Sequence, residues 1–162
     1  MIEGQQNVSG VKCQPDKNQE HMVALSKARL AGLKIMVIDD SKTIRRSAEI
    51  LLHQAGCTVI LAEDGFDALE NIATQIPDLI FADVFMPRLD GYKTCALLKR
   101  STLYKHIPVI MLTSKDGLFD RARGHSAGSS QYLTKPFTKE TLLTTIEAHL
   151  PSARAVSSRL HS

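Results

Sequence analysis

A single carboxylate, Asp83, follows directly on an apolar run that ends at a proline. The run is Leu79–Ala82, and Met86-Pro87 lies just beyond the acid. Proline cannot donate a hydrogen bond to a sheet ladder, so a strand must end near Asp83 and leave it at the carboxyl end. An aspartate in that place is often only a turn residue. The other apolar runs decide between a turn and a chemical site.

Three further apolar runs end in polar residues that could do chemistry. Continuous apolar runs are typical of strands covered on both faces, as in a parallel sheet. The carboxyl ends of such strands meet at one edge, where open α/β sheets bind ligands. One crevice would therefore collect three carboxylates, a hydroxyl and an ammonium group. The runs are Ile35–Ile38, followed by Asp39-Asp40; Val109–Leu112, followed by Thr113-Ser114; and Gln131–Thr134, followed by Lys135-Pro136.

The carboxylates of Asp39, Asp40 and Asp83 would repel one another in one crevice, so a proton or a cation must be held there. An all-oxygen ligand set open to water favours Mg²⁺, or Mn²⁺ in its place, over zinc. Such a cation would join the acids to a phosphoryl oxygen, while Lys135 and the Thr113 hydroxyl reach two other oxygens. Together these groups suit in-line transfer of a phosphoryl group onto Asp83, which gives an acyl phosphate.

Length and composition limit the class of protein. The chain has 162 residues, 43% of them hydrophobic, enough for one ordinary domain with a sizeable core. No apolar stretch approaches membrane-spanning length, and the start lacks the basic-then-apolar order of a secretory signal, so we expect a cytoplasmic protein. Cys13, Cys57 and Cys95 are then expected to be free thiols. The net charge of +3, without an aromatic-studded basic stripe, does not indicate nucleic-acid binding.

Caps and apolar stripes predict helices between the strands. Ser41, Asp64 and Asp90 can each cap a helix, and Gly56 suits the left-handed position after the first of them. The segment Lys115–Gly128 predicts the weakest helix, because its three glycines cost conformational entropy. The apolar positions expected to face the core are Ile44, Ala48, Leu51, Leu52 and Ala55; Phe66, Ala68, Leu69, Ile72 and Ile76; Tyr92, Cys95, Leu98 and Leu103; and, in a last helix, Leu142, Leu143, Ile146 and Leu150.

With a further strand over Thr58–Ala62, the pattern is five strands alternating with five helices. It predicts an α/β fold with a doubly wound parallel sheet in the flavodoxin-like order 2-1-3-4-5, which makes the first and third strands neighbours. Residues 1–32 are predicted to be a flexible leader, 33–150 the domain, and 151–162 a loose tail. The Lys135-Pro136 bond is predicted to be cis, because a tight turn must return Lys135 to the crevice.

The residues from Lys34 to about Leu150 resemble a response-regulator receiver domain of two-component signalling. The resemblance covers nearly three quarters of the chain and rests on motifs that are specific together and weak alone. It implies a signalling protein, not an enzyme, that accepts a phosphoryl group on Asp83 from the phosphohistidine of a sensor histidine kinase. The motifs are the pair Asp39-Asp40, the segment Asp83–Gly91, Thr113-Ser114 and Lys135-Pro136-Phe137.

The resemblance also implies a metal site. Asp40, Asp83 and the backbone carbonyl of Phe85 would bind Mg²⁺, and Asp39 would act mainly through metal-bound water. Phe85 and Lys115 depart from chemotaxis receivers, which often carry Asn and Glu at these positions beside the path of the hydrolytic water. The lifetime of the phosphoryl group therefore does not follow from the resemblance.

The implied output is a protein–protein contact by a monomer that does not bind DNA directly. The segments Ser41–Arg46 and Pro87–Leu97 are most similar to stand-alone regulators of type IV pilus twitching motility, so the downstream partner would be a motility or signalling protein. By the same resemblance, Tyr132 turns inward when Thr113 moves toward the phosphoryl group. We expect the face formed by Lys115–Gly128, the strand of Tyr132 and the last helix to change on phosphorylation.

Two other functions fit parts of the pattern. A Mg²⁺-dependent phosphatase similar to the haloacid dehalogenases would also use an aspartyl nucleophile, but it needs a second Asp two residues later as general acid. Phe85 stands there and cannot transfer a proton. A degenerate receiver that serves only as a scaffold would have lost a key residue, and none is missing from the motifs.

Overall fold

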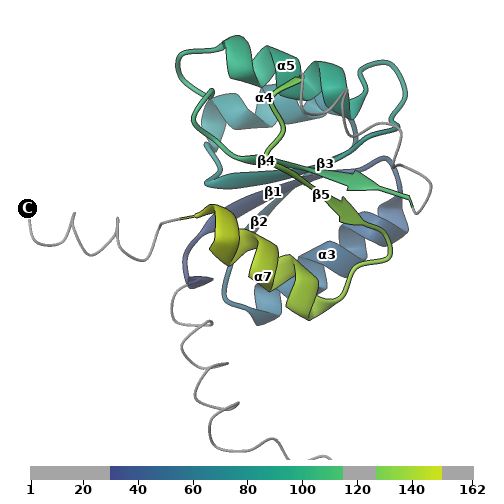
Figure 1. The fold of residues 1–162 in the computed structure, drawn as a ribbon, viewed down its shortest axis with the longest axis vertical. Coiled ribbons are helices and arrows are strands. Elements are labelled where there is room, and N and C mark those ends of the chain that lie inside the picture. Colours follow the sequence, from purple (N-terminus) through teal and green to yellow (C-terminus); the bar gives the residue numbers. More distant parts are fainter. Residues whose placement is uncertain (1–29, 115–126, 151–162) are drawn as a thin grey trace, which may run out of the picture.

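A computed structural model describes residues 30–114 and 127–150 (Figure 1). Its centre is a five-stranded, all-parallel sheet in the order β2-β1-β3-β4-β5, which confirms the predicted topology. Nearly all of the predicted leader, most of the helix predicted over Lys115–Gly128 and the predicted tail lie outside the described residues. The described elements are β1 (Lys34–Ile38), α3 (Lys42–Gln54), β2 (Thr58–Ala62), α4 (Gly65–Thr74), β3 (Leu79–Asp83), α5 (Gly91–Arg100), β4 (Val109–Thr113), β5 (Gln131–Thr134) and α7 (Lys139–His149).

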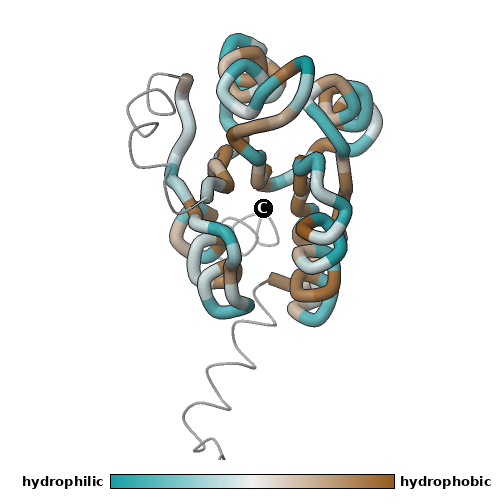
Figure 2. Tube along the Cα trace, turned by 90° about the vertical axis from the view of Figure 1, so that its right-hand side faces the viewer, coloured by the Kyte–Doolittle hydropathy of each residue, from teal (hydrophilic) through white to brown (hydrophobic). Residues whose placement is uncertain are grey.

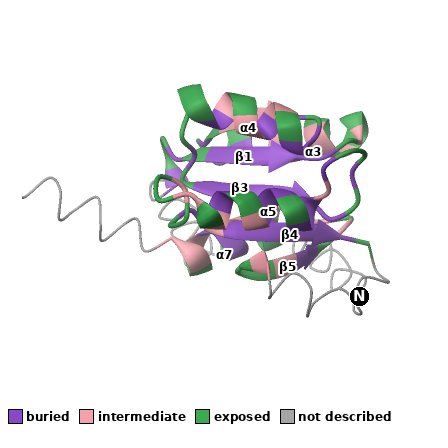
Figure 3. Cartoon of the chain, turned by 90° about the horizontal axis from the view of Figure 1, so that it is seen from above, coloured by how far each residue is buried: buried purple, intermediate pink, exposed green. Residues whose placement is uncertain are grey.

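Helices cover both faces of the sheet. Helices α4 and α5 pack on one face, and α3 and α7 pack on the other (Figure 1). Every residue of β3 and of β4 is buried, as Figure 3 shows for the middle of the sheet. The helices alternate hydrophilic and hydrophobic residues along the chain (Figure 2). The uninterrupted apolar runs of the sequence therefore belong to strands that are covered on both faces.

The predicted helix starts and turns are present. Ser41, Asp64 and Asp90 each cap the next helix, where the side chain accepts a hydrogen bond of 2.8 to 3.3 Å from the amide three residues on. These bonds satisfy amides that a first helical turn leaves unpaired. Gly56 takes φ +91°, which places it in the left-handed region after α3, and the Lys135-Pro136 bond is cis.

Three apolar residues that were predicted to face the core lie at the surface. Phe66, Ile76 and Leu103 are 50%, 51% and 67% exposed. Ile76 and Leu103 lie beyond the ends of α4 and α5, where helical periodicity no longer sets the direction of a side chain. Phe66 is in the first turn of α4 but outside the stripe that buries Ala68, and the Arg88 guanidinium lies over its ring.

The core extends beyond the predicted start of the domain. Leu30 is 2% exposed, its carbonyl lies 3.6 Å from the thiol of Cys57, and the Gly32 amide donates to the Gly56 carbonyl. Leu30 therefore contributes to the core although it belongs to the segment predicted as leader. Cys57 and Cys95 are free, as predicted, and burial raises the pKa of each thiol to about 11.

Gly91 begins α5 at a place where no side chain fits. A Cβ there would overlap the backbone oxygen of Asp83 and would lie 3.1 Å from the Met111 side chain. We expect Gly91→Ala to lower the free energy of unfolding by roughly 1–3 kcal/mol, because the strand end would have to move. Urea unfolding followed by circular dichroism measures the loss. Lys93→Ala, at an exposed position of the same helix, is the control, and equal stability of the two variants would contradict this packing.

Candidate functional site

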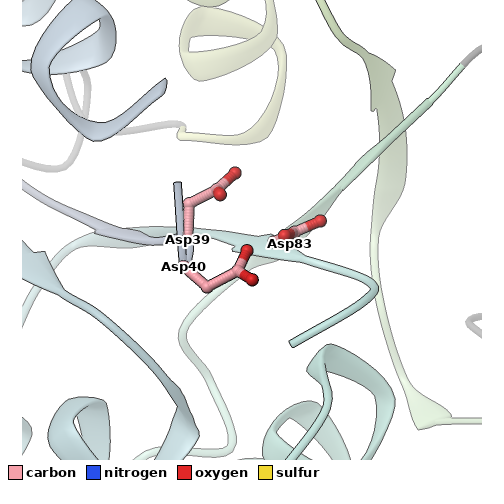
Figure 4. Close-up of side chains that lie close together, drawn as sticks. All are labelled: Asp39, Asp40 and Asp83. Atoms are coloured by element: carbon pink, nitrogen blue, oxygen red, sulfur yellow. The ribbon is translucent and has the colours of Figure 1, made fainter. Parts of the chain in front are cut away.

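Asp39, Asp40 and Asp83 gather at the carboxyl edge of the sheet (Figure 4). Asp83 is the last residue of β3, and the acidic pair follows β1, whose Ile38 is paired with Ala82. One carboxylate oxygen of each acid lies within 4.8 Å of the others. Asp39 and Asp83 are 0% and 4% exposed, whereas Asp40 is exposed. The parallel pairing of β1 and β3 therefore creates an acidic crevice with one side open to solvent.

The Lys135 ammonium lies between the two buried acids. Its Nζ is 3.2 Å from Asp39 Oδ2 and 3.1 Å from Asp83 Oδ1. The Lys135 amide donates to the Thr113 carbonyl at 2.7 Å, and the cis bond to Pro136 follows. Burial lowers the pKa of the ammonium, but the two carboxylates outweigh it, so the pKa is raised. Lys135 therefore stays charged and offsets part of the repulsion among the acids.

The pKa of Asp83 is raised from 3.8 to about 7. Burial is the largest cause, and the negative charge of Asp39 adds to it, whereas the hydrogen bond and the charge of Lys135 act in the opposite direction. A carboxyl in this environment takes up a proton or attracts a cation near neutral pH. A bound cation would therefore favour the ionised form of Asp83, which is the form that can act as a nucleophile.

The other predicted site residues surround this centre. Thr113 ends β4, the neighbour of β3, and is 5% exposed. The Phe85 amide donates to Asp83 Oδ1 at 3.4 Å, while its side chain is 62% exposed. Tyr132, on β5, is half-buried, and its hydroxyl lies 3.3 Å from that of Tyr92. The fold thus brings all of the predicted residues to the same edge of the sheet or to the strand beside it.

Two arginines contact this region without having been singled out in the sequence. Arg45, in α3, donates to the backbone carbonyl of Asp39 at 2.6 Å. Its place one helical turn after Ser41 was the available signal, since that turn lies over the acidic pair. Arg88, in the loop after β3, pairs with Asp64. No local pattern indicates this contact, because it joins residues 24 positions apart.

The donor set fits Mg²⁺. Three carboxylates and a loop carbonyl are hard oxygen ligands, and the exposure of Asp40 leaves room for the waters that Mg²⁺ usually keeps. Neither a thiol nor an imidazole belongs to the cluster, which argues against zinc.

The sequence profile of the response regulator receiver domain matches residues 35–147. The chain belongs to the response regulator receiver domain family, and it is therefore a signalling protein. Protein PilG of Pseudomonas aeruginosa is 66% identical over 121 residues, which cover 75% of this chain and 90% of that protein. Response regulator MprA of Mycobacterium ulcerans is 42% identical over 119 residues, which span 50% of its length.

Solved structures show the same fold. The chemotaxis protein CheY4 of Vibrio cholerae superposes with a TM-score of 0.71 at 34% identity, over 74% of this chain and 100% of that one. The receiver domain of the Francisella response regulator 1452 superposes with a TM-score of 0.65 at 32% identity, over 73% and 96%. Among the described residues, no helix is both long and apolar enough to cross a membrane.

The raised pKa of Asp83 makes stability depend on pH. The unfolded carboxyl ionises near 3.8 and the folded one near 7, so its cost to the folded state grows between these pH values and is constant above them. In metal-free buffer, Asp83→Asn should raise the free energy of unfolding by roughly 1–3 kcal/mol at pH 8 and leave it unchanged near pH 3.

Urea unfolding at several pH values measures this difference. Glu70→Gln, which removes an exposed carboxylate of α4, is the matched control and should show no comparable gain. A loss of stability in Asp83→Asn at pH 8 would show that the attraction to Lys135 exceeds the repulsion within the crevice.

Proposed function

We propose that the chain is a phosphorylation-controlled response regulator that accepts a phosphoryl group on Asp83 from a sensor histidine kinase. The observation that carries the proposal is the position of Asp83: a buried carboxylate at a strand end, 3.1 Å from Lys135 and within 4.8 Å of the acidic pair. Membership of the receiver family supports the same role.

In the proposed reaction, a carboxylate oxygen of Asp83 attacks the phosphorus as the P–N bond to the donor imidazole breaks. The electron pair of that bond stays on the imidazole nitrogen, and the acyl phosphate remains on Asp83. Lys135 neutralises one phosphoryl oxygen and the Thr113 hydroxyl donates to another. Both groups come from strand ends or from the turn after a strand, so they are held by the sheet and need little ordering during the reaction.

Asp40, Asp83 and the Phe85 carbonyl would hold Mg²⁺, and Asp39 would contribute mainly through water. Bound Mg²⁺ supplies positive charge that stabilises the phosphoryl oxygens during transfer. The half-exposed geometry of the crevice, with Asp40 open and Asp39 buried, supports this division of roles.

The pathway we propose is type IV pilus twitching motility, with a downstream motility or signalling protein as the partner. The 66% identity to PilG supports it, together with the resemblance of Ser41–Arg46 and Pro87–Leu97 to regulators of that pathway. Output would pass through the face of β5 and α7, where Tyr132 lies. The segment Lys115–Gly128, which we predicted to take part, lies mostly outside the described residues.

Phosphorylation by a small donor tests the acceptor. Incubation with acetyl phosphate and Mg²⁺ should add one phosphoryl group that hydroxylamine removes, and Asp83→Asn should remain unlabelled. Asp78→Asn is the control, because Asp78 pairs with the Lys34 amide at the start of β1 and far from the crevice. Equal labelling of Asp83→Asn and the wild type, measured by intact-protein mass spectrometry, would contradict the assignment.

The metal site is tested by stability. Mg²⁺ should raise the melting temperature of the wild type, because it binds the folded state and relieves the repulsion among the carboxylates. Asp40→Asn should lose most of this increase, whereas the Asp78→Asn control should keep it. Differential scanning calorimetry with and without EDTA measures the effect, and a wild type indifferent to Mg²⁺ would count against the whole site.

A further inference from the structure

The loop between β3 and α5 has a strained residue at its centre. Arg88 takes φ 68°, and it is the one non-glycine residue with positive φ in the described parts of the chain. Side chains disfavour this region, so a residue remains there only where surrounding contacts hold it. The Leu89 amide donates to the Pro87 carbonyl at 2.8 Å, which closes a tight turn around Arg88. The contacts that hold this turn lie outside the acidic crevice.

The Arg88 side chain reaches across to the start of α4. Its guanidinium donates to Asp64 Oδ2 and lies over the Phe66 ring, 5.5 Å from the centroid. Asp64 is 6% exposed and also accepts from the Asp67 amide at 2.8 Å as the cap of α4. That backbone hydrogen bond outweighs burial, and with the charge of Arg88 it lowers the pKa of Asp64. The pair is therefore charged and is anchored to a helix end.

The next residue of the loop packs at the same place. Leu89 is 8% exposed and lies over Gly65, where a Cβ would be 2.7 Å from Leu89 Cδ2 and would overlap the Thr94 hydroxyl. The start of α4 and the loop thus approach as closely as a glycine allows. Two successive loop residues, Arg88 and Leu89, are fixed to the same helix end.

On the other side of Phe85, the loop is fixed to the sheet. The Val84 amide donates to the Leu112 carbonyl at 3.0 Å, and the Val84 carbonyl accepts from Gly91 at 3.1 Å. Phe85 itself has an exposed side chain and a long amide hydrogen bond of 3.4 Å. Its peptide unit therefore takes its direction from the anchors on either side. Met86 packs in the core, so loss of one anchor would turn the peptide without releasing the loop.

We infer that Arg88, through its pair with Asp64, is a positioning residue that aims the Phe85 carbonyl into the acidic crevice. This inference rests on the proposed function, which assigns that carbonyl to Mg²⁺. Groups that orient a metal ligand without touching the metal commonly change affinity tenfold or more. The stack on Phe66 excludes water from one side of the pair, which strengthens the interaction between the charges.

Titration of the full chain with Mg²⁺ by isothermal calorimetry tests the inference. Arg88→Ala should weaken binding roughly tenfold. Asp64→Asn should weaken binding in the same direction, since asparagine still caps a helix but carries no charge. The double variant should be no weaker than the weaker single variant, because both changes remove one interaction. Arg88→Lys, which keeps the charge but loses the planar fork, should recover part of the affinity.

A matched control separates positioning from charge. Arg46, on α3, is 68% exposed and pairs with Glu49, so Arg46→Ala removes the same charge from the surface. Loss of a positive charge alone should leave Mg²⁺ affinity unchanged or raise it, which is opposite in sign to the effect expected at Arg88. Hydrogen exchange in metal-free buffer should be faster in residues 84–90 of Arg88→Ala, with the remainder of the sheet unchanged.

The outcomes distinguish this inference from the function on which it rests. If the wild type binds Mg²⁺ and Arg88→Ala binds it equally well, Arg88 does not position the ligand, and the proposed function stands. Faster exchange over the whole domain of Arg88→Ala would show general destabilisation and would also overturn the inference. If Asp40→Asn binds Mg²⁺ as the wild type does, the metal site itself is wrong, and both proposals fall.

Discussion

Repulsion among the carboxylates of Asp39, Asp40 and Asp83 is the constraint on which the rest of the site depends. Two of the three acids are buried, and an oxygen of each lies within 4.8 Å of the others. Their charges can be held together only with positive charge close by, and the Lys135 ammonium, 3.1 to 3.2 Å from two of them, supplies part of it. The raised pKa of Asp83 shows that this compensation is incomplete. The remaining demand for positive charge is what makes the crevice suited to a divalent cation and an incoming phosphoryl group.

The sheet supports this concentration of charge because its interior is rigid and apolar. Strands β3 and β4 are buried throughout, so Asp83 and Thr113 are held at fixed positions by packing on both faces. The turn after β5 returns Lys135 to the crevice through a cis bond. Receiver domains are signalling proteins, and a site of this kind joins a local change of charge to the strands and helices around it.

The loop after Asp83 shows how a second layer of residues can support the first. Gly91 and Gly65 allow two helix starts to approach the loop closely, and the charged pair of Arg88 and Asp64 connects it to α4. None of these residues lies in the acidic crevice. Their contribution would be to the geometry of the oxygen ligands, which for a cation with strict octahedral preference decides affinity.

Much of this protein was determined by its sequence alone. Apolar runs predicted the parallel sheet and its order, and the polar residues at their ends predicted where Asp83, Thr113 and Lys135 would meet, because strand period and crossover handedness leave few topologies. Tertiary structure decided what local pattern does not encode. Phe66 was expected in the core and instead lies at the surface beneath Arg88, and Leu30 joined the core from a segment predicted as leader. These outcomes depend on contacts between residues far apart in the chain, and periodicity within one element carries no information about its partners.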